Sequence, residues 1–268
     1  MINNLKSYLR DIKNYFAPTR HPFGKKIVDT KEYYINIFND VRNKEYLEID
    51  KYLSCKRFQI DKNWVDNLAL HTQVVKKKSP INYQHGMILY SCLREYIHNS
   101  KNKFIEILEI GTARGFSSIC MSKALNDSNT NGLITTIDII ANNLPMFWNC
   151  IDDHEGPKTR IELLSKWRNE LKNINFLTGP SRMVLKKINM QRINFAFVDG
   201  MHDMTSIKRE FNFIKLRQKI NDIIIFDDVS EDFPEIIKFI KDLEKLNEYK
   251  IEIISSDLIR SYAICKKI

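Results

Sequence analysis

The sequence predicts an α/β fold, a doubly wound and mostly parallel seven-stranded Rossmann-like sheet with an antiparallel last strand and a helical N-terminal extension. Beyond residue 100, short apolar runs alternate with segments of helical period, and each run ends in a glycine or an acid, as buried parallel strands do. Six of the eight glycines also lie beyond residue 100, so the tightly turned part of the chain is C-terminal. This alternation indicates a βαβ series.

Five apolar runs predict parallel strands, and two later runs predict a hairpin. The parallel strands are expected at residues 104–110, 133–139, 174–178, 193–199 and 222–228. The last two runs, 249–255 and 260–268, are separated by only a few residues. They suit an antiparallel hairpin that closes the edge of the sheet.

Helical periodicity marks the segments between these strands. A helix at 84–98 leads into the first strand, and a helix at 205–217 follows the fourth strand, with Thr205 as its expected cap. A further helix opens near Pro234, because proline is favoured in the first helical turn.

The length of 268 residues suits one large α/β domain with an extension. Residues 1–83 lack the strand alternation, so we assign them to a helical or irregular extension or lid. Residues 84–268 then form the ligand-binding domain.

Composition excludes several classes of protein. With 43% hydrophobic and 28% charged residues, no run approaches the length of a membrane span, and the N-terminus lacks the form of a secretion signal. We therefore expect a cytoplasmic protein. Five scattered cysteines without a C-x-x-C pair indicate reduced thiols. The net charge of +9 permits a nucleic-acid partner, but the lysines are spread along the chain and lack interleaved aromatic residues, which favours a compositional bias.

The loop after the first strand has the form E-x-G-x-x-x-G, from Glu109 through Gly111 to Gly115, and it opens a helix. It lacks the third glycine of the dinucleotide fingerprint, which disfavours a pyrophosphate-bearing cofactor. An acid near the first glycine suits an ammonium group. At the end of the second strand, Asp138 is placed to accept both hydroxyls of a ribose. The combination fits S-adenosylmethionine.

These motifs resemble those of class I S-adenosylmethionine-dependent methyltransferases, and the resemblance covers residues 84–268. It implies an adenine pocket shaped by the residues after the third strand. Ser117 serves equally well as a helix cap, and Arg114 could project into solvent. The residues expected to bind the cofactor are Glu109, Gly111, Thr112, Arg114, Gly115, Ser117, Asp138, Gly179 and Ser181.

Three acids and a histidine follow the fourth and fifth strands: Asp199, His202, Asp227 and Asp228. The carboxyl ends of neighbouring strands converge on the ligand crevice of a doubly wound sheet, so these side chains should meet there. Three uncompensated carboxylates repel one another, and oxygen ligands favour Mg²⁺, Mn²⁺ or Ca²⁺. We therefore expect the three aspartates to bind a divalent cation, most simply Mg²⁺, with Asp199 and His202 as the catalytic residues and His202 as the base.

The spacing D-G-x-H followed by D-D resembles metal-dependent sugar O-methyltransferases of the macrocin and mycinamicin type. It departs from the catechol type at His202 and Asp228. The resemblance implies a small-molecule acceptor with a sugar hydroxyl. A polar segment at 152–156, with Trp148, could contribute to the acceptor pocket, although such loops are more often solvated.

Two alternatives stay open: a nucleic-acid methyltransferase, which the charge permits, and an S-adenosylmethionine-binding protein without chemistry. The fourth strand is not followed by the Pro-Pro-aromatic motif that enzymes methylating base amino groups use. The complete set of acids and histidine argues against the second. The acceptor, the methylated position and a homo-oligomeric state are not readable from the sequence.

Overall fold

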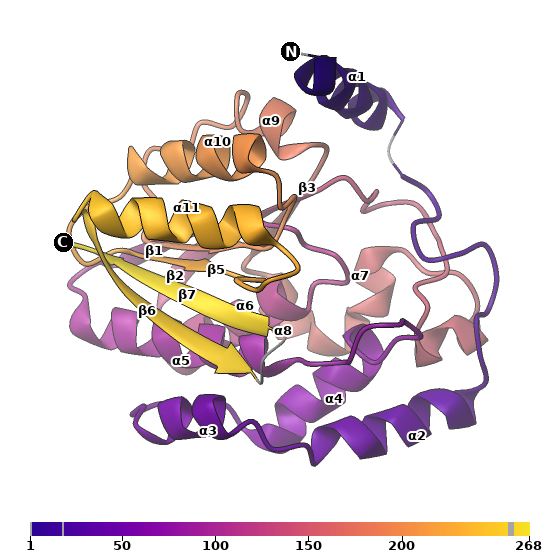
Figure 1. Ribbon diagram of the computed structural model, residues 1–268. Coiled ribbons are helices and arrows are strands. Elements are labelled where there is room, and N and C mark those ends of the chain that lie inside the picture. Colours follow the sequence, from indigo (N-terminus) through magenta and orange to yellow (C-terminus); the bar gives the residue numbers. More distant parts are fainter. Residues whose placement is uncertain (1, 18, 257–259) are drawn as a thin grey trace.

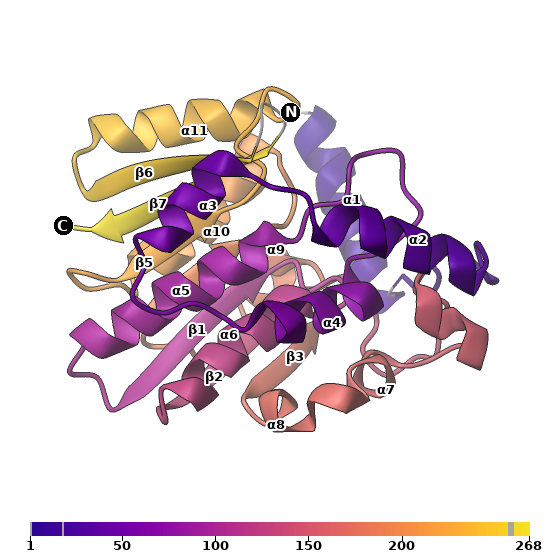
Figure 2. The ribbon, with the colours of Figure 1, turned by 90° about the horizontal axis from the view of Figure 1, so that it is seen from below.

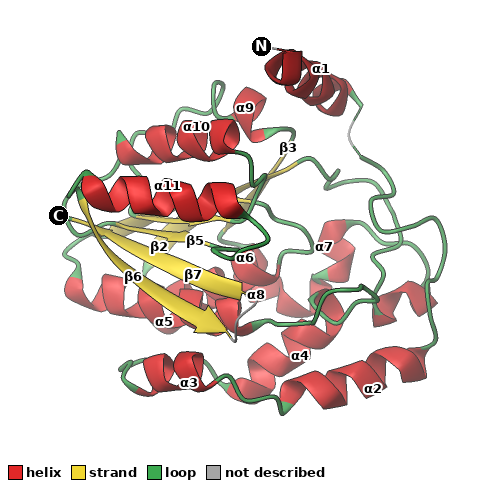
Figure 3. Ribbon diagram, viewed as in Figure 1, coloured by secondary structure: helices red, strands yellow, loops and turns green. Residues whose placement is uncertain are grey.

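A seven-stranded sheet runs through the centre of the molecule, with helices on both faces (Figures 1 and 3). The computed structural model describes residues 2–17, 19–256 and 260–268. The strand order is β3-β2-β1-β4-β5-β7-β6. The strands are β1 (Phe104–Ile110), β2 (Asn131–Asp138), β3 (Ile174–Thr178), β4 (Phe195–Val198), β5 (Ile223–Phe226), β6 (Tyr249–Ser256) and β7 (Arg260–Lys267).

The strand directions confirm the predicted sheet. β1 to β5 pair in parallel, and β7 pairs antiparallel with both β5 and β6. The C-terminal hairpin therefore forms, with its second strand inserted beside β5. β1 and β3 have the predicted bounds, whereas β4 and β5 are shorter than predicted because the acids at their ends lie outside the ladder.

Two helical layers bury the two faces of the sheet, and the strands alternate between them. Ile107 of β1 packs into the cluster beneath α5 and α6, and its neighbour Leu108 packs into the cluster beneath α10 and α11. Sheet and helices thus share a dry core on each face. The helices of the domain are α5 (Gln84–Asn99), α6 (Phe116–Asp127), α7 (Arg160–Leu163), α8 (Arg168–Leu171), α9 (Ser181–Val184), α10 (Met204–Lys215) and α11 (Pro234–Lys245), with 3-10 turns η1 (Ile151–Glu155) and η2 (Ser165–Trp167).

The N-terminal segment is helical, as predicted, and most of it packs on the α5 and α6 layer (Figure 2). Ile49, Val65 and Leu68 are fully buried in the same cluster as the side chains of α5 and α6. The first helix lies apart from the others, near α9 (Figure 1). The N-terminal helices are α1 (Ile2–Phe16), α2 (Lys31–Arg42), α3 (Leu47–Ser54) and α4 (Lys62–Thr72).

One predicted cap is wrong. Helix α10 begins at Met204, and its cap is Asp203, whose carboxylate accepts hydrogen bonds from the backbone N–H groups of Thr205 and Ser206. An aspartate cap precedes the helix by one residue and satisfies two of its free N–H groups, so Thr205 lies inside the first turn. The five cysteines are free thiols, as expected. No helix within the described residues is long and apolar enough to cross a membrane.

Candidate active site

The glycine loop between β1 and α6 brings two parts of the backbone into contact. Gly111 has φ +99°, and a Cβ atom there would lie 1.9 Å from the carbonyl oxygen of Asp199. Gly115 has φ +91°, and its Cβ would meet Leu164 at 2.7 Å. Both positions require glycine for backbone conformation and for space. The loop therefore presses against the start of the segment that follows β4.

Glu109 lies beneath this loop and is fully buried. Its Oε2 accepts hydrogen bonds from Ser118 and Thr136, the latter at 2.5 Å, while Oε1 has no partner. Burial raises the pKa of this carboxyl. Glu109 thus supports the glycine loop from inside the protein. Ser117, the serine before Ser118, instead lines a cavity.

Asp138 ends β2, as predicted, and its carboxylate holds the glycine loop. Oδ2 accepts from the backbone N–H of Ala113 at 2.6 Å, and Oδ1 accepts from that of Ile140 at 2.8 Å. Each oxygen has further lone pairs, so hydrogen bonding to the loop leaves capacity for ligand hydroxyls.

A cavity of about 310 Å³ opens beside this carboxylate, and we call it the Asp138 cavity. It extends from the glycine loop across the ends of β2, β3 and β4 to helix α1. Its lining includes Gly111, Asp138, Ile139, Gly179, Ser181, Asp199, Met201 and Glu210, together with Asp11 and Asn14 of α1. Four of the predicted cofactor-binding residues therefore surround one space, and the N-terminal helix contributes to its wall.

A second cavity, of about 380 Å³, lies on the other side of the glycine loop, and we call it the Lys77 cavity. Gly111 and Asp199 line both cavities, so the two spaces meet at these residues. The lining of the Lys77 cavity includes Lys77, Asn82, His85, Thr112, Arg114, Ser117, Asp228, Phe233 and Arg260.

Asp199, His202 and Asp228 lie close together beside this junction: Asp199 lines both cavities, Asp228 lines the Lys77 cavity, and His202 lines neither. Each offers one ligand atom, and these atoms lie within 4.8 Å of one another. The Nε2 atom of His202 is 3.3 Å from Oδ2 of Asp228 but has no hydrogen-bond partner, and its ring packs on Phe233 at 4.1 Å between centroids. Burial and the charge of Asp227 raise the pKa of Asp199 and of Asp228.

Asp227 is not one of these three residues and instead binds Arg260. Both of its oxygens accept from the guanidinium, Oδ1 from Nε at 2.7 Å and Oδ2 from the other arm of the fork. Burial alone would raise the pKa of Asp227, and the Arg260 charge holds it below the usual value. Nε of Arg260 also lies 3.2 Å from Oδ1 of Asp228. The structure thus brings together three of the four residues predicted for catalysis and metal binding.

The polar segment at 152–156 lines neither cavity. Asp152 is buried against His71, with Nδ1 and Oδ2 2.5 Å apart, and Asp153 accepts from the backbone N–H of Trp148 at 2.7 Å. The expectation that these acids are solvated is wrong, because they organise the connection after β2. Arg114 joins them, with Nε donating to the carbonyl of Trp148 at 2.6 Å.

Four residues at the two cavities were not anticipated from the sequence. Lys77 and Arg260 line the Lys77 cavity, while Asp11 and Glu210 line the Asp138 cavity. Glu210 is buried, and its pKa is raised to about 7 by that burial. None belongs to a local motif. Lys77 lies in a run of three lysines, Lys76 to Lys78, and such a run by itself indicates only a cluster of charge.

Comparison with known proteins agrees with this geometry. Residues 108–229 match a family model described as a methyltransferase domain. The O-methyltransferase from Bacillus cereus, solved in complex with SAH, superimposes with a TM-score of 0.53 at 16% identity over 87% of this chain and 96% of that one.

Two further solved structures are similar in the same way. TomG, an O-methyltransferase from Streptomyces achromogenes in complex with SAM, gives a TM-score of 0.53 at 16% identity over 82% of this chain and 95% of that one. The O-methyltransferase NovP gives 0.53 at 12% identity over 89% and 99%. The sequence matches no curated protein. Residues 108–229 thus match a model of a methyltransferase domain, and the chain has the Rossmann-like fold of these solved structures, as its sequence predicts.

Proposed function

We propose that this protein is an S-adenosylmethionine-dependent O-methyltransferase that acts on a hydroxyl of a small molecule. One observation carries the proposal: two cavities of ligand size meet at Gly111 and Asp199. A methyl transferase needs such an arrangement, because the donor and the acceptor must approach in line at one point. The match to a methyltransferase domain and the fold support it.

The Asp138 cavity suits the adenosine part of the cofactor. Asp138 is the acceptor for the ribose hydroxyls, and Ile139 and Met201 supply apolar walls beside Gly179 and Ser181. The methionine part would pass Gly111 towards Thr112 and Ser117, which line the neighbouring cavity. In this arrangement the sulfonium lies near Asp199. Glu109 and Gly115 keep the loop in shape from below.

The donor set at the junction fits a divalent cation. Within the described residues, the three carboxyl groups of Asp199, Asp227 and Asp228 lie near one guanidinium, that of Arg260, which contacts Asp227 and Asp228. The Nε2 atom of His202, which has no hydrogen-bond partner among the described residues, lies beside the oxygens of Asp199 and Asp228, where it can accept a proton. Asp199 and Asp228 would hold the ion, and Asp227, although named as a ligand from the sequence, is engaged with Arg260. A bound Mg²⁺ would lower the pKa of an acceptor hydroxyl.

The protein's own residues carry the other steps. Asp199 and Gly111 set where the two substrates meet, and His202 takes the proton of the acceptor hydroxyl at Nε2. The acceptor oxygen then forms a bond to the methyl carbon as the carbon–sulfur bond breaks, which gives a methyl ether and S-adenosylhomocysteine. Polar groups around the Lys77 cavity, including Asn82, suit an acceptor with several hydroxyls, and the D-G-x-H and D-D pattern favours a sugar.

Calorimetric titration with S-adenosylmethionine, with and without Mg²⁺, tests the proposal. The wild-type protein should bind the cofactor, and Asp138→Ala should weaken binding at least 10-fold. Asp199→Asn should abolish the effect of Mg²⁺ and lower turnover of sugar acceptors by about 100-fold or more, the usual scale for a lost catalytic group. Asp242→Asn, a change of the same kind at an exposed site on α11, is the matched control.

The outcomes separate the parts of the proposal. Absence of cofactor binding in all conditions would overturn it. Cofactor binding and turnover without any response to Mg²⁺ or to chelation would overturn the metal alone. Binding without turnover of any hydroxyl acceptor would favour the alternative of a protein that only binds the cofactor.

A further inference from the structure

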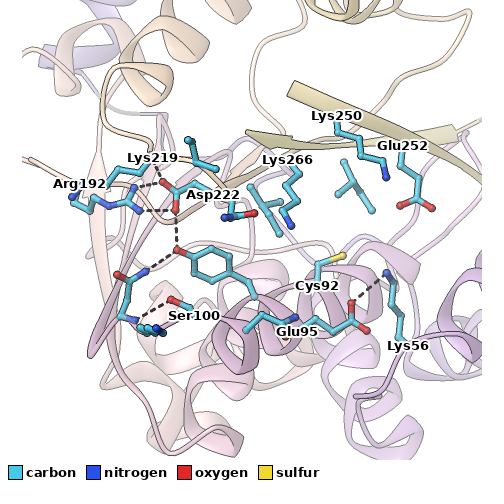
Figure 4. A pocket seen from close by; sticks show the side chains of 18 of the residues that line it. Lys56, Cys92, Glu95, Ser100, Arg192, Lys219, Asp222, Lys250, Glu252 and Lys266 are labelled. Atoms are coloured by element: carbon cyan, nitrogen blue, oxygen red, sulfur yellow. Dashed lines mark hydrogen bonds and ion pairs between the residues drawn. The ribbon is translucent and has the colours of Figure 1, made fainter. Parts of the chain in front are cut away.

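A third cavity, larger than the Asp138 and Lys77 cavities, lies at the opposite edge of the sheet, where the parallel strands begin (Figure 4). Its volume is about 540 Å³, and we call it the Lys250 cavity. It is bounded by the end of α5, the segments before β1 and β5, and the hairpin of β6 and β7. The methyltransferase reaction proposed above uses none of its residues.

Cations outnumber acids around this cavity. The cations are Lys56, Lys101, Arg192, Lys219, Lys250 and Lys266, and the acids are Glu95, Asp222 and Glu252. Two of the acids are already neutralised from within the cavity wall. Asp222 forms a two-armed ion pair with Arg192, and Glu95 lies 3.4 Å from Lys56.

Four lysines remain, and only Glu252 is left to oppose them. Within the described residues, no ion pair engages Lys101, Lys219, Lys250 or Lys266. The cavity therefore has an excess of three positive charges. All four lysines are exposed, and Figure 4 shows Lys250 and Lys266 directed from the hairpin into one space.

The register of the β6 and β7 hairpin brings two of these lysines close together. Lys250 and Lys266 are directly paired across β6 and β7. Directly opposed residues have Cβ atoms roughly 5 Å apart on the same face, and like charges at such a pair destabilise the sheet. An anion between the two ammonium groups would remove this repulsion.

We propose that the Lys250 cavity binds a small molecule that carries two linked phosphate groups. A phosphate group carries a charge of about −1.5 to −2 at neutral pH, so two are needed to balance an excess of three. The neutral donors Asn99, Asn102 and Asn221 line the same space and can bind phosphate oxygens. Ammonium groups bind phosphate as point charges, without a fixed fork geometry.

A nucleic-acid strand fits the cavity less well. Single strands are bound through aromatic rings on which the bases stack. The two tyrosines here are engaged in the wall: the hydroxyl of Tyr96 donates to Asp222 at 2.8 Å, and that of Tyr52 lies 3.2 Å from the sulfur of Cys92. A diphosphate is therefore the ligand that the charges favour.

Titration calorimetry at low ionic strength, without divalent metal and with sodium pyrophosphate as the probe, tests this site. We expect saturable binding to the whole protein, and at least 10-fold weaker binding in Lys250→Gln/Lys266→Gln. The matched control is Lys238→Gln/Lys241→Gln, which removes the same charge from exposed positions of α11. Thermal midpoints of both double variants verify that the fold is intact.

Further arms locate and define the site. Lys77→Gln should leave pyrophosphate binding unchanged, because Lys77 lines the other basic space. Orthophosphate should bind more weakly than pyrophosphate. If ADP binds as tightly as pyrophosphate, the site recognises the diphosphate group alone. If ADP binds more tightly than pyrophosphate, the ligand is a nucleoside diphosphate. Equal losses in both double variants, loss in Lys77→Gln, or binding of an RNA oligonucleotide without binding of pyrophosphate would overturn the proposal.

Discussion

The two edges of the sheet each hold one buried arginine–aspartate pair, and the charges around the two pairs have opposite signs. At the carboxyl edge, Asp227 is 0% exposed beside Arg260 at 20%; at the amino edge, Asp222 is 1% exposed beside Arg192 at 20%. Around the first pair lie two more carboxylates, and around the second lie four lysines for which the described residues provide no ion pair. The pairs alone are structural. The charge left over beside each pair is the basis of the two proposals, a cation site at the carboxyl edge and an anion site at the amino edge.

The carboxyl edge is tightly packed where the glycine loop meets Asp199, and a glycine substitution there has the largest expected effect. Gly111→Ala would place a Cβ within 1.9 Å of a backbone carbonyl at the carboxyl edge, so we expect a loss of more than about 4 kcal/mol in the free energy of unfolding. Gly156→Ala is the control, because φ is +97° there and nothing lies within 4 Å of the added atom. Since ψ is 176°, a conformation that essentially only glycine adopts, this change should cost only backbone strain, about 1–3 kcal/mol. Urea denaturation measures both, and equal losses would contradict the close approach of Gly111 to Asp199.

The two buried pairs can be broken separately. Arg260→Met and Arg192→Met should each lower the free energy of unfolding by about 3–5 kcal/mol, because each leaves a buried carboxylate unpaired. Only Arg260→Met should also impair methyl transfer, since Arg260 contacts Asp228 at the junction of the cavities. Denaturation curves and turnover of the same preparations give the comparison. A matching loss of activity in Arg192→Met, after allowance for the unfolded fraction, would show that the edges are not functionally separate.

Glu210 allows a smaller test, in which pH controls the charge. Burial raises the pKa of Glu210 to about 7 in the folded protein, against 4.5 in the unfolded chain. Between these two pH values, the folded protein holds a proton that the unfolded chain has lost. Its contribution to stability is therefore complete below about pH 4.5 and is lost as the pH rises through 7. Glu210→Gln stays uncharged and should be more stable than wild type at pH 8, by up to about 3 kcal/mol, with little difference at pH 4.5. Thermal midpoints across this range measure the effect. A pH-independent difference would contradict the shifted pKa.

The fold could be predicted well because each buried strand is recognisable from its own short stretch of sequence. β1 and β3 are short and mainly apolar runs, and the hairpin follows from two further runs joined by a short connection. The order β5-β7-β6 could not be predicted, because it depends on which strand of the hairpin pairs with β5. The same limit hid Arg260. Its pairing with Asp227 requires the register of β7 on β5, which no local pattern encodes.

The candidate site was predictable where residues follow strand ends and unpredictable where the tertiary structure assigns partners. The convergence of Asp199, His202 and Asp228 follows from parallel strands ending at one edge. The burial of Glu109 and the hydrogen bonds from Asp138 to the loop depend on side-chain packing, so the sequence could name these residues without their contacts. The Lys250 cavity could not be predicted either. Its lysines lie far apart in a lysine-rich sequence, and only the fold brings them together.

The smallest expected effect concerns the amino edge without any ligand. If Lys250 and Lys266 repel across the hairpin, Lys250→Gln should stabilise the protein by a few tenths of a kcal/mol, up to about 1, at low salt. The gain should vanish near 1 M salt, where the Debye length is only about 3 Å. Lys238→Gln on α11 is the control and should change little. Denaturation at two salt concentrations measures the difference. Salt screens the exposed lysines here, whereas it screens a buried charge at the carboxyl edge much less. A loss of stability in Lys250→Gln would contradict the repulsion. It would mean that Glu252 already stabilises Lys250, so that the cavity has less positive charge with which to bind an anion.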